Sequence, residues 1–107
     1  MGLSLEVVRK NVDEALRRIE AARLRAGYDH QVRIVAATKY VAAVDMRVVR
    51  DAGIRLVGEN RANELQEKWR LYGQDFEFHF IGHVQHRKVP DVLPCVTMIH
   101  SVDSLRL

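Results

Sequence analysis

The chain has 107 residues, 48% of them apolar and 29% charged, and its 17 basic and 14 acidic residues give a formal net charge of +3. This length allows one domain, and so average a composition excludes disordered and collagen-like chains. Apolar runs are only a few residues long, whereas a membrane-spanning helix needs about 20, and the first residues lack a signal-peptide pattern, so we expect a cytoplasmic protein without a membrane partner.

The charge pattern argues against nucleic acid as a partner. Over residues 6–25, basic and acidic side chains are interleaved, which is typical of a solvated helix face, and no aromatic residues lie among them to stack on bases. The single cysteine, Cys95, cannot form an internal disulfide, which agrees with a cytoplasmic location. We expect Cys95 to be a packed core residue rather than a nucleophile.

The first predicted element is an amphipathic helix from Leu5 to Ala26, where apolar residues recur at spacings of three and four. Ser4 is its expected N-cap, and Gly27 is its expected end. The period then changes. Residues 32–38 are short, β-branched and nearly all apolar, which predicts a strand buried on both faces in a parallel sheet.

The rest of the chain alternates between helix and strand patterns. The predicted segments are, in order, a helix over 45–52, a strand over 55–58, a helix over 61–72, a strand over 76–81, a helix over 84–93, a strand over 97–100 and the start of another helix at Ser104. The helix over 61–72 has one apolar side, made of Ala62, Leu65, Trp69 and Tyr72.

This alternation predicts right-handed βαβ crossovers and an α/β fold with parallel strands, either a flavodoxin-like open sheet or part of a (β/α)8 TIM barrel. An open sheet would normally have a glycine-rich turn after its first strand, but this strand runs into Thr38, Lys39 and Tyr40. The barrel is therefore favoured. Because a whole barrel needs about 250 residues, we expect residues 1–107 to be its N-terminal part, a first helix and about three and a half βα units.

Functional residues of barrels lie at the carboxyl ends of the strands. Lys39 ends the first strand, either as a desolvated, nucleophilic amine or as the first solvated residue after a buried strand, and the pattern leaves both open. Glu59 and Asn60 end the second strand. Asn60 also fits an N-cap of the following helix, and Glu59 fits a neighbour of that helix's dipole.

Histidines occur along the third strand and after it. On an apolar strand, His79 is more often a hydrogen-bonded core residue than a catalytic one. His79, His83 and His86 have no cysteine or carboxylate at ligand spacing, so we expect no metal site.

Four motifs in chain order resemble one known family. They are Val35-Ala36-Ala37-Thr38-Lys39, then Gly58-Glu59-Asn60 with Glu64 following, then His79-Phe80-Ile81-Gly82 leading to Gln85 and Lys88, and finally His100-Ser101-Val102-Asp103. Over nearly its whole length the chain resembles the YggS/PROSC family of pyridoxal 5′-phosphate (PLP) homeostasis proteins. These proteins resemble the N-terminal barrel domain of alanine racemase.

The resemblance implies that PLP is held as a Schiff base on Lys39. It also implies that Asn60 and His79 face the cofactor. Such a protein carries or buffers PLP without catalytic turnover, and PLP-dependent apoenzymes are its expected partners.

Two departures and one absence qualify the resemblance. The family usually has leucine where this chain has Val84 and asparagine where it has Arg87, and Arg87 adds charge near the barrel mouth. The resemblance places the phosphate-binding segment and the partner of the pyridine nitrogen beyond these residues. We therefore expect this chain alone to bind PLP weakly, and its unpaired strand edges to favour self-association or pairing with the missing half.

Two other functions remain as alternatives. The first is a Schiff-base enzyme, a racemase or aldolase-like barrel, that uses Lys39 together with residues of the missing half. The second is a nucleic-acid or structural module that depends on the excess of basic residues.

Overall fold

The computed structural model describes residues 2–27 and 29–102, so the helix expected from Ser104 lies outside the described residues. Within them, four parallel strands form one sheet in the order β1-β2-β3-β4. The strands are β1 (Ala36–Ala37), β2 (Leu56–Glu59), β3 (Glu77–Phe80) and β4 (Met98–Ile99).

The strand order decides between the two folds that the sequence left open. A doubly wound sheet of the flavodoxin type places its first strand between later ones and its helices on both faces. Here the strands follow one another in chain order, and α2, α3 and α4 contribute to a single apolar cluster against the sheet. The chain therefore has the consecutive βα units of a partial (β/α)8 barrel, as predicted.

The helical segments follow the predicted pattern with small shifts. They are α1 (Leu5–Ala26), a short 3₁₀ turn η1 (Ala43–Asp45), α2 (Met46–Asp51), α3 (Ala62–Tyr72), η2 (His86–Lys88), α4 (Val89–Val92) and η3 (Leu93–Cys95). No helix in the described ranges combines the length and apolar character that a membrane span requires.

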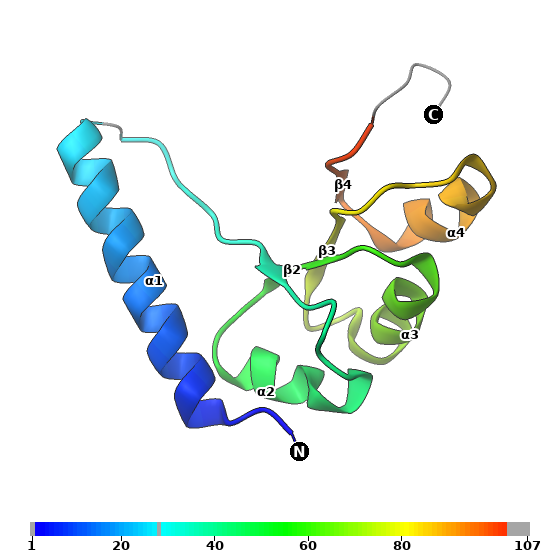
Figure 1. Ribbon diagram of the computed structural model, residues 1–107, viewed down its shortest axis with the longest axis horizontal. Helices are drawn as coiled ribbons and strands as arrows, with labels where there is room; N and C mark the ends of the chain where they lie inside the picture. Colours follow the sequence, from blue (N-terminus) through cyan, green and yellow to red (C-terminus); the bar gives the residue numbers. More distant parts are fainter. Residues whose placement is uncertain (1, 28, 103–107) are drawn as a thin grey trace.

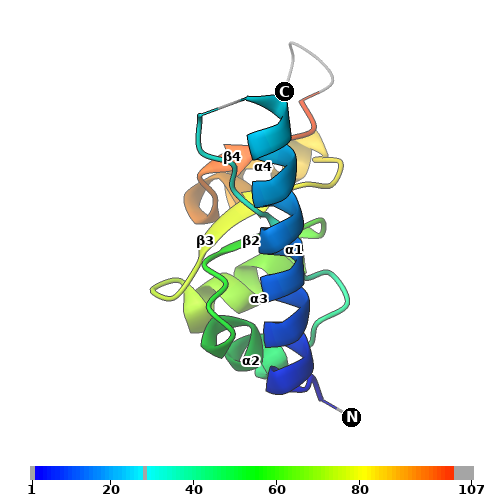
Figure 2. The same ribbon diagram turned by 90° about the vertical axis from the view of Figure 1, so that its left-hand side faces the viewer.

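The first helix, α1, forms as predicted but lies to one side of the sheet (Figures 1 and 2). The Ser4 hydroxyl accepts the Val7 N–H at 3.3 Å, and Gly27 ends the helix with a φ of 75°, which favours glycine. Near its beginning, the Arg9 guanidinium donates to the carbonyl of Asp51 in α2 at 3.1 Å. None of its residues is fully buried, so its apolar stripe is only partly covered.

Two predicted elements differ in the structure. The strand expected over 32–38 is shorter in the structure, where β1 covers two residues. The expectation that this strand is buried on both faces is wrong, because Ala37 is exposed. The reason is that Ala37 points to the face of the sheet opposite α2, α3 and α4, whereas Ala36 packs against their core. The single helix expected over 84–93 is three short segments, because Pro90 and Pro94 lack the N–H that a continuous helix needs. Each proline lies in the first turn of a new segment.

The core lies between the sheet and the three helices that follow its strands. Its buried members are Met46, Val49, Val57, Leu65, Phe76, Phe78, Phe80, Val84, Val92 and Cys95. Alternation along β2 and β3 directs Val57, Phe78 and Phe80 to this side. In α3, however, Trp69 is 41% exposed, against expectation, and the neighbouring Lys68 is buried.

Two leucines of α3 test this core. Leu65 is fully buried, whereas Leu71 is 60% exposed. We predict that Leu65→Ala lowers the free energy of unfolding by ~2–5 kcal/mol, because it leaves a cavity among packed side chains. Leu71→Ala, the matched control, should change it by less than ~1 kcal/mol. Urea unfolding measures both, and equal losses would contradict this assignment of the core.

Candidate functional site

The strand register places one candidate residue, His79, on a defined face of the sheet. Ala37, Gly58, His79 and Met98 are aligned across β1 to β4. Because side chains alternate along a strand, these residues lie on the face opposite the helices, which we call the open face. Lys39, Asn60 and His100 each follow two residues later, at the carboxyl ends of their strands.

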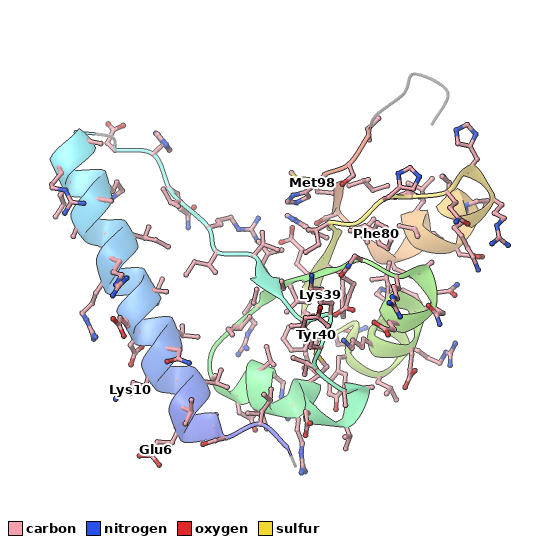
Figure 3. All side chains as sticks on the ribbon, in the orientation of Figure 1. Glu6, Lys10, Lys39, Tyr40, Phe80 and Met98 are labelled. Atoms are coloured by element: carbon pink, nitrogen blue, oxygen red, sulfur yellow. The ribbon has the colours of Figure 1, made fainter. Side chains whose placement is uncertain are left out.

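Lys39 presents an accessible amine at the end of β1. Its side chain is exposed, and its ammonium lies 5.1 Å from the ring centroid of Tyr40 (Figure 3). It lines a hollow of about 320 Å³ together with Glu64, Glu67 and Lys68 of α3. In the described residues, Lys39 is therefore a solvated amine and not the desolvated one that the sequence also allowed.

Beneath Lys39 lies a buried polar cluster that sequence reasoning missed. The Lys68 ammonium donates to Glu59 Oε2 at 2.9 Å and to the Thr38 carbonyl oxygen at 2.7 Å. The Thr38 hydroxyl also donates to the Glu59 carboxylate. The Glu59 side chain, which also fitted a neighbour of the α3 dipole, is fully buried in this pair. A signal existed: Lys68 lies three residues after Leu65 and four before Tyr72, in the apolar stripe.

Asn60 is not a helix cap. The N-cap position of α3 is Arg61, whose side chain makes no capping bond. Instead, Asn60 Oδ1 is buried without a hydrogen-bond partner. The end of β3 packs tightly here, because a Cβ on Gly82 would lie 2.3 Å from the Cβ of Asn60. An unpaired buried acceptor is costly, so Asn60 Oδ1 retains an unused capacity to accept a hydrogen bond.

His79 is a buried, hydrogen-bonded histidine, as predicted, and is 4% exposed. Its Nε2 lies 3.2 Å from Glu77 Oε2, and its Nδ1 lies 3.0 Å from Nε2 of His100. Glu77 also accepts from the Arg33 guanidinium and the Thr97 hydroxyl, both at 2.6 Å. The structure thus joins His100, which sequence reasoning left unassigned, to His79.

Among the described residues, no three histidine, cysteine or acidic side chains are grouped to hold a metal ion. Cys95 is buried, and burial raises the pKa of its thiol, which disfavours the nucleophilic thiolate.

Comparisons with known proteins point to one family. No protein-family model matches the chain. The pyridoxal phosphate homeostasis protein of Synechocystis is 41% identical over 78 residues, 71% of this chain and 36% of that protein. That of Aquifex aeolicus is 34% identical over 100 residues, 92% of this chain and 44% of that protein. The chain thus spans less than half the length of these curated relatives.

A solved structure gives the same picture. PipY of Synechococcus elongatus, described with PLP bound, matches with a TM-score of 0.66 and 32% identity. The match covers 80% of this chain and 42% of PipY.

The Glu77 network predicts a specific acid sensitivity. Hydrogen bonds hold the pKa of the Glu77 carboxyl at about 2, well below its ordinary value of 4.5. The bond from Arg33 has the largest effect, followed by the bond from Thr97. A carboxyl whose pKa is lowered by folding stabilises the fold above its ordinary pKa and loses that contribution as the pH falls towards the folded value. We predict that Glu77→Gln flattens the fall in Tm between about pH 4.5 and pH 2.

The matched control is Glu67→Gln, which changes an exposed glutamate. It should retain the parent's acid dependence of Tm. If both variants retain the parent profile, the Glu77 network contributes nothing to stability in acid.

Proposed function

This chain belongs to the YggS/PROSC family of pyridoxal phosphate homeostasis proteins, and on that premise we propose that it holds PLP in a cytoplasmic homeostasis role, with Lys39 as the point of attachment. Cytoplasmic location is supported by the one cysteine, a buried free thiol. The PLP bound to PipY supports the choice of cofactor.

The single observation that carries the proposal is the exposed Lys39 amine at the carboxyl end of β1. Lys39 supplies a primary amine that condenses with an aldehyde carbon, with loss of water and formation of a C=N bond.

Two further side chains are proposed to contact the cofactor. Asn60 has a buried oxygen without a partner, which fits a donor on a ligand. His79 is held in position on the open face by Glu77 and His100, so its ring orientation is set before any ligand arrives. When bound, PLP supplies a reactive aldehyde and an electron-withdrawing pyridine ring.

We propose carriage of the cofactor rather than turnover of a substrate. The relatives are named for PLP homeostasis. A racemase or aldolase also needs an acid or base group placed against its substrate, and His79 and His100 bond to each other. Racemisation of amino acids by the purified chain would overturn this part of the proposal. PLP-dependent apoenzymes are the proposed recipients of the cofactor.

We predict that Lys39 is the main site of reaction with PLP. After incubation with excess PLP and reduction with borohydride, peptide mass spectrometry should find most of the pyridoxyl group on Lys39. Lys39→Arg keeps the charge but not the primary amine, so total labelling should fall to the level of the remaining lysines.

The control is Lys10→Arg, which removes an exposed lysine of α1 and should leave Lys39 labelling unchanged. Labels spread evenly over Lys10, Lys39 and Lys88 would contradict the proposed site.

The edges of the sheet predict association. In the described sheet, β1 and β4 each pair with one strand only, and unpaired edges are templates for further strands. Light scattering should therefore give a mass above the 12.3 kDa of one chain. A dispersed monomer at high concentration would contradict this prediction.

A further inference from the structure

Lys68 of α3 is buried, whereas lysines on helices normally lie on the solvated face. Lys68 is 3% exposed, and its ammonium bonds to the Glu59 carboxylate and to the Thr38 carbonyl. Replacing a buried ion pair with apolar residues is often neutral or stabilising, so stability is weak ground for keeping these charges. The two hydrogen bonds of the Lys68 ammonium instead hold a particular backbone segment in place.

They hold the start of the turn that carries Lys39. The Thr38 carbonyl oxygen accepts both the Lys68 ammonium at 2.7 Å and the Val41 N–H at 3.0 Å. The second of these bonds closes a turn whose two middle residues are Lys39 and Tyr40. Lys68 thus clamps the peptide group that immediately precedes Lys39.

The remaining polar groups of Thr38 are also occupied. Its N–H donates to the carbonyl of Gly58 at 3.1 Å, and its hydroxyl donates to the Glu59 carboxylate. Thr38 is only 2% exposed, so water does not compete for these bonds. The backbone before Lys39 is consequently fixed to β2 and to α3, while the Lys39 side chain is exposed.

We propose that Lys68 and Glu59 are positioning residues for Lys39. By holding Thr38, they fix the direction in which the Lys39 amine leaves the sheet and so favour its reaction with the aldehyde of PLP over that of any other lysine. This inference rests on the proposed function. Its physical basis is that a fixed attachment point raises the fraction of time that an amine spends within reach of a bound reactant.

The test compares two lysines within one molecule. The parent chain and the double variant Lys68→Met with Glu59→Met are incubated with excess PLP and reduced with borohydride. The Met pair leaves no unpaired buried charge. We expect the ratio of Lys39 to Lys10 labelling to fall by about tenfold in the double variant, since small misplacements of reacting groups cost ~10²-fold in rate. Lys10 is the exposed internal reference.

A matched double variant, Lys88→Met with Glu20→Met, removes the same two residue types from less buried positions away from the hollow that Lys39 lines, and should keep the parent's ratio. Circular dichroism and urea unfolding confirm that each variant is folded. A folded Lys68→Met, Glu59→Met chain with the parent's ratio overturns the inference and leaves the proposed function intact. A parent chain without preference for Lys39 overturns the proposed function itself.

Thr38 provides a second test if the double variant does not fold. Thr38→Val keeps the shape of the side chain but removes the hydroxyl that bonds to Glu59. It should lower the ratio of Lys39 to Lys10 labelling, and Thr38→Ser, which retains a hydroxyl, should restore it. Equal ratios in the two folded variants would overturn the clamp, because both change packing but only one removes the hydrogen bond.

Discussion

The buried ion pair between Lys68 and Glu59 is the constraint on which the carboxyl ends of β1 and β2 depend. It joins the middle of α3 to the ends of both β1 and β2 through a single ammonium and a single carboxylate. Charges taken out of water are tolerated only when their partners are close and well placed, so these three segments cannot shift independently. The ion pair therefore fixes the two strand ends that Lys39 and Asn60 follow.

Neighbouring residues of one strand end serve the two faces of the sheet. Glu59 points to the helices and joins the buried ion pair through Oε2, and both its Oε1 and the Oδ1 of Asn60 are buried without a hydrogen-bond partner. On the open face, Glu77 links Arg33, Thr97 and His79 into a second polar network. Alternation along the strands thus places the buried ion pair and the Glu77 network on opposite faces of the sheet.

The motifs and the geometry contribute different observations on Lys39, the proposed attachment site. The motifs directed attention to Lys39, Asn60 and His79 through their order along the chain. The structure adds that the backbone before Lys39 is held at Thr38 while the Lys39 side chain is exposed. It also adds His100, whose Nε2 meets His79 across neighbouring strands.

Local pattern determined most of the secondary structure: the α1 stripe with its Ser4 cap and Gly27 end, and the alternation of helices and strands, could all be read from the sequence. Strand order, and hence the barrel rather than the open sheet, was decided by tertiary structure. Tertiary structure also decided that Lys68, rather than Trp69, lies on the buried side of α3. The physical reason is that hydrophobic periodicity acts over a few residues, whereas a buried charge depends on partners such as Thr38, which lies 30 residues away.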